Sequence, residues 1–171
     1  MNSVYLGDCR ECMRGLIAAG LRVQCIVTSP PYFGLRNYGV AGQIGLEETP
    51  DEYVAKMVEV FRLARDLLRE DGTLWLNLGD SYVSVGSGHQ GDGLMKTRRV
   101  AQVRDRKAVH GAVERPPSVD GLAPKNMIGI PWRVAFALQA DGWWLRQDVI
   151  WHKPNAMPET LVESGRAARR E

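Results

Sequence analysis

The sequence predicts a layered α/β fold built on a mostly parallel sheet. Helical and strand patterns alternate along the chain, and the strand patterns end in polar or proline-rich residues. The 171 residues, 44% of them hydrophobic, are enough to form one domain with a real core. Alternating strands and helices favour β-α-β units, whose crossovers are right-handed and whose ligands bind at the carboxyl ends of the strands.

The first of these units spans residues 4–28. Residues 4–6 predict a short strand, and residues 10–19 follow a helical pattern that Gly20 ends. The apolar run 23–27 predicts a buried strand. We therefore expect two strands joined by one helix.

The second unit begins with a helix start signal. Residues 49–52 (Thr-Pro-Asp-Glu) form a capping box with proline at the first helical position. Apolar residues then recur with helical spacing as far as Leu68, and we expect Asp71 and Gly72 to end this helix. Residues 73–78 alternate in polarity, which predicts a strand.

The third unit starts near Pro131 and resembles the second. A helical pattern runs to Gly142, and residues 143–151 predict a strand that ends in a polar segment beginning at His152. Asp80, after the second unit's last strand, is expected either to line the site or to cap a neighbouring element.

Residues 84–125 lack any regular pattern. They contain several glycines and eight basic residues against four acidic ones. Two interpretations are open, a solvated flexible insertion or an electrostatic contact for nucleic-acid phosphates.

Composition limits the remaining classes. No run of eighteen apolar residues and no basic leader is present, so we expect no membrane association and no secretion. The formal net charge of +2 says little about partners. Three cysteines suit a reducing cytoplasm rather than a disulfide framework, and the pair Cys9 and Cys12 lacks the second pair of a zinc site. We expect a cytoplasmic protein without a metal, and read these two cysteines as ordinary thiols, with redox chemistry as the alternative.

The segment Ser29, Pro30, Pro31 and Tyr32, called the 29–32 loop below, follows the buried strand 23–27. Proline cannot donate to a sheet and restricts the residue before it, so two prolines make a stiff loop at the strand end. A hydroxyl, two carbonyls and an aromatic ring are then presented together. The alternative interpretation is a polyproline-type turn or recognition peptide.

Four blocks in order make the chain similar to the amino-methylating DNA methyltransferases, which transfer a methyl group from S-adenosylmethionine to an exocyclic base nitrogen. The resemblance covers nearly all of residues 3–159 and implies a Rossmann-like sheet in circularly permuted order, with the catalytic half first. The blocks are 5–8 (Tyr-Leu-Gly-Asp), 28–32 (Thr-Ser-Pro-Pro-Tyr), 71–77 (Asp-Gly-Thr-Leu-Trp-Leu-Asn) and 148–155 (Asp-Val-Ile-Trp-His-Lys-Pro-Asn).

The resemblance implies roles for individual residues. The Ser29 hydroxyl and the Pro30 carbonyl would accept the two amine hydrogens, with Pro31 stiffening the loop and Tyr32 stacking on an extruded base. Asp8 and Ser29 would contact the cofactor, Asp8 through its adenine amine; the alternative for Asp8 is a helix N-cap. His152 and Lys153 would form pocket wall or contact the DNA backbone.

Serine at the first loop position leans toward N4 of cytosine in double-stranded DNA, with N6 of adenine as the alternative. Two other classes are open. One is an inactive DNA-binding remnant acting through residues 84–125. The other is a protein-glutamine methyltransferase, which usually has asparagine at the first loop position.

One family feature does not occur in the sequence, the glycine-rich Asp-Pro-Phe-x-Gly-x-Gly turn that cradles the methionine part of the cofactor. We therefore expect an amino-terminal part of such an enzyme, with residues 1–159 as an incomplete catalytic half-domain and 160–171 as an irregular tail. Alone it should bind S-adenosylmethionine weakly or not at all. Its expected partners besides DNA are a complementing carboxyl-terminal half or a second copy.

Overall fold

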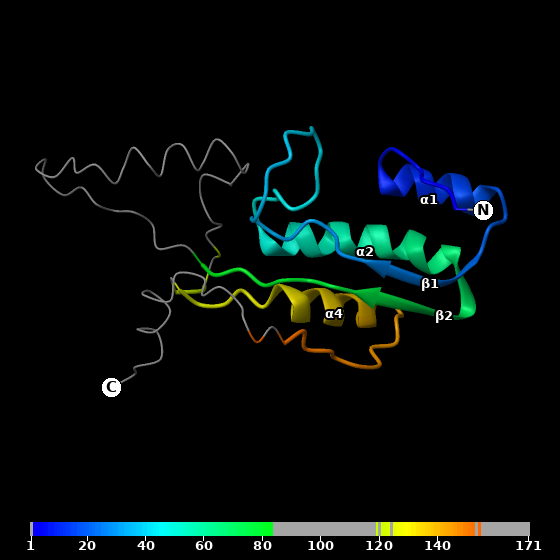
Figure 1. The fold of residues 1–171 in the computed structure, drawn as a ribbon. Coiled ribbons are helices and arrows are strands. Elements are labelled where there is room, and N and C mark those ends of the chain that lie inside the picture. Colours follow the sequence, from blue (N-terminus) through cyan, green and yellow to red (C-terminus); the bar gives the residue numbers. More distant parts are fainter. Residues whose placement is uncertain (1, 84–118, 120, 124, 153, 155–171) are drawn as a thin grey trace, which may run out of the picture.

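A computed structural model describes residues 2–83, 119, 121–123, 125–152 and 154 (Figure 1). In this part of the chain the elements alternate between helix and strand, which confirms the predicted α/β class. They are α1 (Cys9–Ala18), β1 (Val23–Thr28), α2 (Pro50–Leu67), β2 (Leu68–Leu76) and α4 (Ile130–Ala140).

Strands β1 and β2 form a parallel pair connected through α2, and they lie side by side in Figure 1. Ile26 pairs with Leu74, and both side chains pack against the core, whereas Val27 and its partner Trp75 are exposed. One face of this pair is therefore covered and the other is open.

Strand β2 begins earlier than the sequence predicted. Helix α2 ends at Leu67, and Leu68 turns to extended geometry, is buried and pairs with Val23. The expectation that Asp71 and Gly72 end the helix is wrong, since both lie within β2. The pairing is irregular there, and a Cβ on Gly72 would lie 2.9 Å from the Arg69 carbonyl oxygen. The glycine thus permits a close backbone approach within the strand rather than a helix stop.

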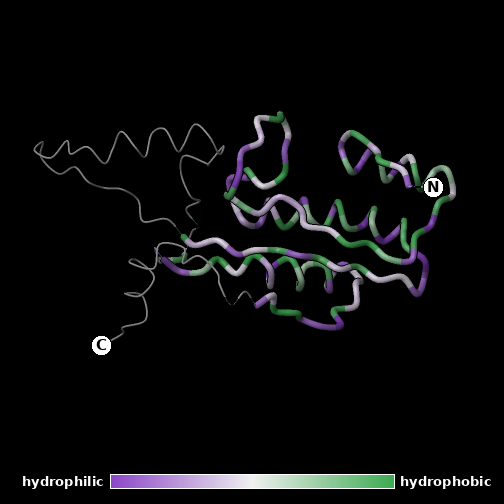
Figure 2. The backbone as a smooth tube through the Cα atoms, in the orientation of Figure 1, coloured by the Kyte–Doolittle hydropathy of each residue, from purple (hydrophilic) through white to green (hydrophobic). Residues whose placement is uncertain are grey.

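The core lies where α2 and α4 pack together. Met57 and Phe61 of α2 meet Val134 and Leu138 of α4, and Phe33 joins them from the loop after β1. In Figure 2 hydrophobic and hydrophilic positions alternate around α2, as expected of a helix with one buried side. Its predicted capping box is confirmed: the Thr49 hydroxyl accepts from the Glu52 N–H at 3.2 Å.

Two predicted strands are absent from the described residues. Residues 4–6 and 143–151 are irregular, and Leu6 is 100% exposed. An isolated strand cannot satisfy its backbone groups by pairing, and neither segment has a neighbouring strand in the described part. Strand-like sequence was therefore not sufficient here.

Most of residues 84–125 and nearly all residues beyond 152 lie outside the described residues. The predicted insertion and irregular tail are therefore untested. No helix of the described part is long and apolar enough to cross a lipid bilayer.

Candidate active site

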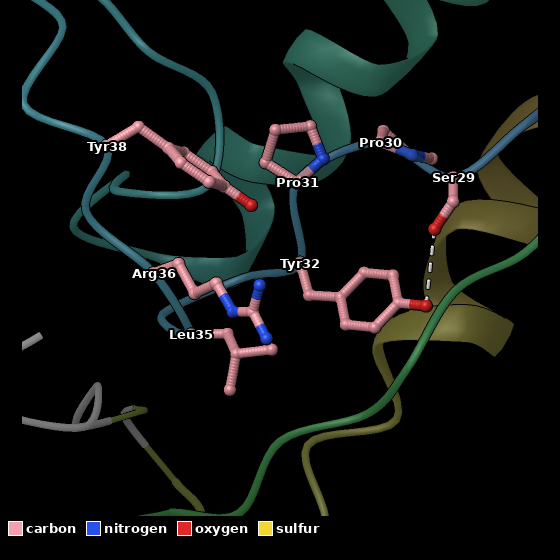
Figure 3. Close-up of a pocket in the computed structure, with 7 residues that line it drawn as sticks. All are labelled: Ser29, Pro30, Pro31, Tyr32, Leu35, Arg36 and Tyr38. Carbon is pink, nitrogen blue, oxygen red and sulfur yellow. Dashed lines mark hydrogen bonds between the residues drawn. The ribbon is translucent and has the colours of Figure 1, made fainter. Parts of the chain in front are cut away.

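The 29–32 loop leaves the sheet at the carboxyl end of β1. The pairing continues one step past β2, where the Asn77 N–H donates to the Thr28 carbonyl at 2.9 Å. All four loop residues then line one open cavity of about 300 Å³ (Figure 3). The structure thus brings together the four residues that the sequence singled out as catalytic.

The polar groups of this loop differ in what they bind. The Ser29 hydroxyl donates to the Tyr32 hydroxyl at 3.3 Å, so the two side chains point toward each other (Figure 3). The Pro30 carbonyl accepts no hydrogen bond from any described residue. Two acceptors of the loop, the Ser29 oxygen and the Pro30 carbonyl, therefore keep capacity for a ligand.

Tyr53 of α2 binds the carbonyl of the second proline. Its side-chain hydroxyl donates to the Pro31 carbonyl at 2.9 Å, and its ring packs on Phe33 at a centroid distance of 5.6 Å. Burial, helped by the nearby Glu47 and Tyr32, raises the pKa of Tyr53 well above its ordinary value. The hydroxyl therefore stays protonated and remains a donor.

Sequence reasoning missed Tyr53. Its helical spacing assigned it to the core, where it does lie, fully buried. The available signal was chemical, because a buried tyrosine hydroxyl needs a polar partner.

Two glycines let backbone approach Tyr32 closely. A Cβ on Gly79 would lie 2.8 Å from Cε2 of the Tyr32 ring, and one on Gly45 would lie 2.9 Å from the Tyr32 carbonyl oxygen. Gly45 also has a φ of +101°, which disfavours other residues. The aromatic ring of Tyr32 thus packs directly against the backbone of the chain after β2.

Asp80 acts as a cap rather than as a pocket residue. Its carboxylate accepts from the Gly129 and Ile130 N–H groups at 3.0 Å, at the start of α4. The neighbouring Ser81 hydroxyl donates to the Phe33 carbonyl at 2.8 Å. These contacts join the segment after β2 both to α4 and to the chain that follows the 29–32 loop.

Asp8 also has a structural partner. It caps α1 by accepting from the Arg10 N–H at 2.8 Å, and both its oxygens bind the Arg10 guanidinium, at 3.0 and 2.6 Å. These hydrogen bonds from Arg10 lower the pKa of Asp8 to about 2. The cap interpretation is confirmed, while the strand expected before Asp8 is absent and Asp8 does not line the cavity of the 29–32 loop.

The other predicted contacts receive less support. His152 is exposed, and Lys153 lies outside the described residues. Among the described residues no three His, Cys, Asp or Glu side chains are grouped so as to hold a metal ion.

A comparison with known protein families identifies the family of this chain. Residues 23–165 match the model of the N6 and N4 methyltransferase family described as DNA methylase. The chain belongs to this DNA methylase family. The predicted resemblance to the amino-methylating enzymes is thereby confirmed.

Individual members are also similar. The type II methyltransferase M.SmaI of Serratia marcescens is 48% identical over 92% of this chain and 50% of its own length. M.Cfr9I of Citrobacter freundii is 45% identical over 94% of this chain and 49% of its own length. M.SfiI of Streptomyces fimbriatus is 36% identical over 93% of this chain and 32% of its own length.

The chain spans about half the length of the first two relatives. No solved structure matches it.

Proposed function

We propose that this chain carries the catalytic loop of an S-adenosylmethionine-dependent DNA methyltransferase that methylates an exocyclic amine of an extruded base. The observation that carries the proposal is that some hydrogen-bond acceptors of the 29–32 loop are already bound by the protein, whereas others can still bind a ligand. Tyr53 binds the Pro31 carbonyl, whereas the Ser29 hydroxyl and the Pro30 carbonyl keep acceptor capacity beside the Tyr32 ring.

This division suits the chemistry of an exocyclic amine. The amine is a poor nucleophile because its lone pair is delocalised into the base. Acceptors at Ser29 and Pro30 would bind its two hydrogens and draw the nitrogen toward a tetrahedral shape, and Tyr32 would hold the base by stacking. When bound, S-adenosylmethionine would supply the methyl group: the bond from carbon to the positively charged sulfur breaks as the bond to nitrogen forms, a neutral thioether leaves, and the amine loses one proton to solvent.

The residues at the cavity are compatible with that cofactor. A sulfonium favours oxygen acceptors and aromatic faces, and this cavity contains the Ser29 hydroxyl and the Tyr32 and Tyr38 rings. Ser29 would therefore lie near both cofactor and base. The predicted contact from Asp8 would require that its carboxylate also accept from the cofactor, beside its bonds to Arg10.

We propose N4 of cytosine as the target, with N6 of adenine as the alternative. Support for cytosine comes from serine at the first loop position, and the family includes both activities. Mass spectrometry of nucleosides from methylated duplex DNA distinguishes the two products directly.

We further propose that a complementing carboxyl-terminal half covers apolar side chains that this structure leaves exposed. Large apolar side chains at Leu6, Trp144, Ile150 and Trp151 are at least three-quarters exposed. Large apolar side chains that remain exposed to this degree are ones that a further part of the protein would cover. A second copy of the chain is the alternative, which sedimentation with and without the added half distinguishes.

Ser29→Ala tests the catalytic assignment. The chain is assayed for methyl transfer to duplex DNA, alone and with the carboxyl-terminal half of the Serratia marcescens relative. Removing one positioned polar group should lower kcat by about 100-fold or more. Ser3→Ala, at an exposed position near the amino terminus, is the matched control.

Equal kcat values for Ser29→Ala and the unmodified chain would exclude the 29–32 loop as the catalytic element. Salt-dependent DNA binding without methyl transfer, even with the added half, would favour the inactive DNA-binding remnant instead.

A further inference from the structure

The cavity beside the 29–32 loop has a second wall that no sequence motif indicated. Leu35, Arg36 and Tyr38 line it together with the loop, and all three belong to the segment 34–45 (Figure 3). In Figure 3 the Arg36 guanidinium extends toward the Tyr32 ring, and the Tyr38 hydroxyl points toward the same space. A cation and two aromatic side chains therefore line the same open cavity.

This wall has a defined backbone despite its exposure. The Gly34 N–H donates to the Gly45 carbonyl at 2.8 Å and closes the base of the segment. The Gln43 side chain bridges its interior, donating to the Arg36 carbonyl and accepting from the Tyr38 N–H, both at 2.7 Å. Arg36 is thus presented from a segment held by its own hydrogen bonds.

The charge of the cavity is unbalanced. None of its seven lining residues is acidic, and among the described residues Arg36 forms no ion pair. A guanidinium keeps its charge at any working pH and binds planar or tetrahedral oxyanions through paired N–H groups. The ligand chemistry that fits this wall is an oxyanion.

We propose that Arg36 binds an oxyanion at this cavity, either the phosphodiester of the target nucleotide or the carboxylate of the methyl donor. The assignment to these two sources rests on the proposed function. A nucleotide joins its base to its phosphate through a single sugar, so a base on Tyr32 would bring a phosphate to the adjoining wall. The donor's carboxylate has the same charge and offers the same pair of oxygens.

The first test needs no enzymatic activity. The full chain is titrated with inorganic phosphate and, separately, with acetate at constant ionic strength, while NMR follows the arginine Nε–Hε signals. The Arg36 signal should shift and saturate. The signal of Arg22, an exposed arginine whose side chain binds only the Leu21 carbonyl among the described residues, should not.

The second test identifies the source of the oxyanion. Arg36→Gln is compared with Arg22→Gln, which removes the same charge elsewhere, for binding of duplex DNA and of S-adenosylhomocysteine. If the source is the phosphodiester, Arg36→Gln weakens DNA binding about tenfold and lowers the slope of log K against log salt by about one. If it is the carboxylate, S-adenosylhomocysteine binding weakens and the DNA slope is unchanged. Arg36→Lys should restore part of the lost affinity.

The outcomes separate this inference from the proposed function. An Arg36 signal unmoved by both anions overturns the inference, whether or not the chain transfers methyl groups. An Arg36 signal shifted by phosphate, in a protein that transfers no methyl group even with the added half, supports the anion site and counts against the enzyme. A third outcome is that the chain transfers methyl groups while Arg36→Gln changes neither DNA binding nor S-adenosylhomocysteine binding. That outcome would support the proposed function and overturn the anion site.

Discussion

The 29–32 loop, which follows a predicted strand, and the segment 143–152, which follows a predicted helix, differ in how far the rest of the chain surrounds them. The loop is bounded by contacts from Tyr53, Gly45 and Gly79, which belong to three separate parts of the chain. The segment 143–152 is richer in large apolar residues, but Trp144 is 82% exposed. The two regions differ in their packing partners. Apolar residues become buried only where another surface of the protein packs against them.

The largest predicted effect tests this contrast with paired truncations. Phe61→Ala, in the core between α2 and α4, should lower the free energy of unfolding by about 3–5 kcal/mol. Trp151→Ala removes a larger ring at a site that is 75% exposed and should change it by less than about 0.5 kcal/mol. Urea unfolding measures both. A comparable loss for Trp151→Ala would mean that the segment 143–152 is packed, and the contrast would fail.

The sequence predicted correctly those features that depend on local residues. The start of helix α2 was predicted correctly because it is encoded locally, by the capping box at 49–52 and proline at the first position. The 29–32 loop was predicted because two prolines restrict the chain wherever they occur. In both cases the information lies in the segment itself.

The errors concern features that depend on distant residues. Residues 4–6 resemble a strand, but pairing is decided by a neighbour that the local pattern does not contain. Tyr53 and Arg36 were missed as site residues because only the fold shows that one reaches Pro31 and the other the cavity. Local chemistry therefore pointed to the loop that lines the candidate site, and tertiary contacts were needed to find the other residues that line or support it.

A smaller effect should come from Gly79, whose backbone packs against the Tyr32 ring. Gly79→Ala places a Cβ within 2.9 Å of two ring carbons, so the ring must move, at an expected cost of about 1–3 kcal/mol. Methyl transfer should fall about tenfold or more, because a displaced ring misplaces the base. Gly15→Ala, where a Cβ meets nothing within 4 Å, is the control and should be neutral or slightly stabilising. Full activity in Gly79→Ala would show that the ring position does not matter.

Tyr53→Phe should have a smaller effect on stability. The variant keeps the ring that packs on Phe33 and removes only the hydroxyl that binds the Pro31 carbonyl. The expected loss is about 1 kcal/mol of unfolding free energy. If Tyr53 positions the loop, kcat falls while the KM for DNA stays the same. A purely structural role predicts the same destabilisation with kcat unchanged below the unfolding transition.

The smallest predicted effect lies at the start of α1, where Asp8 binds Arg10. Asp8→Asn keeps a side chain that can cap α1 and removes the charge, so it isolates the ion pair. The Arg10 hydrogen bonds lower the pKa of Asp8 from 3.8 to about 2, so the stabilisation is present above about pH 4 and disappears as pH falls through 2. Because the carboxylate is 38% exposed, the difference at pH 7 should be less than about 1 kcal/mol, and it should vanish near pH 2. A difference that stays constant from pH 7 to pH 2 would mean that the charge of Asp8 contributes nothing.

If Asp8 contacts the cofactor's adenine amine as well, Asp8→Asn should weaken S-adenosylhomocysteine binding at pH 7 by more than its small effect on folding explains.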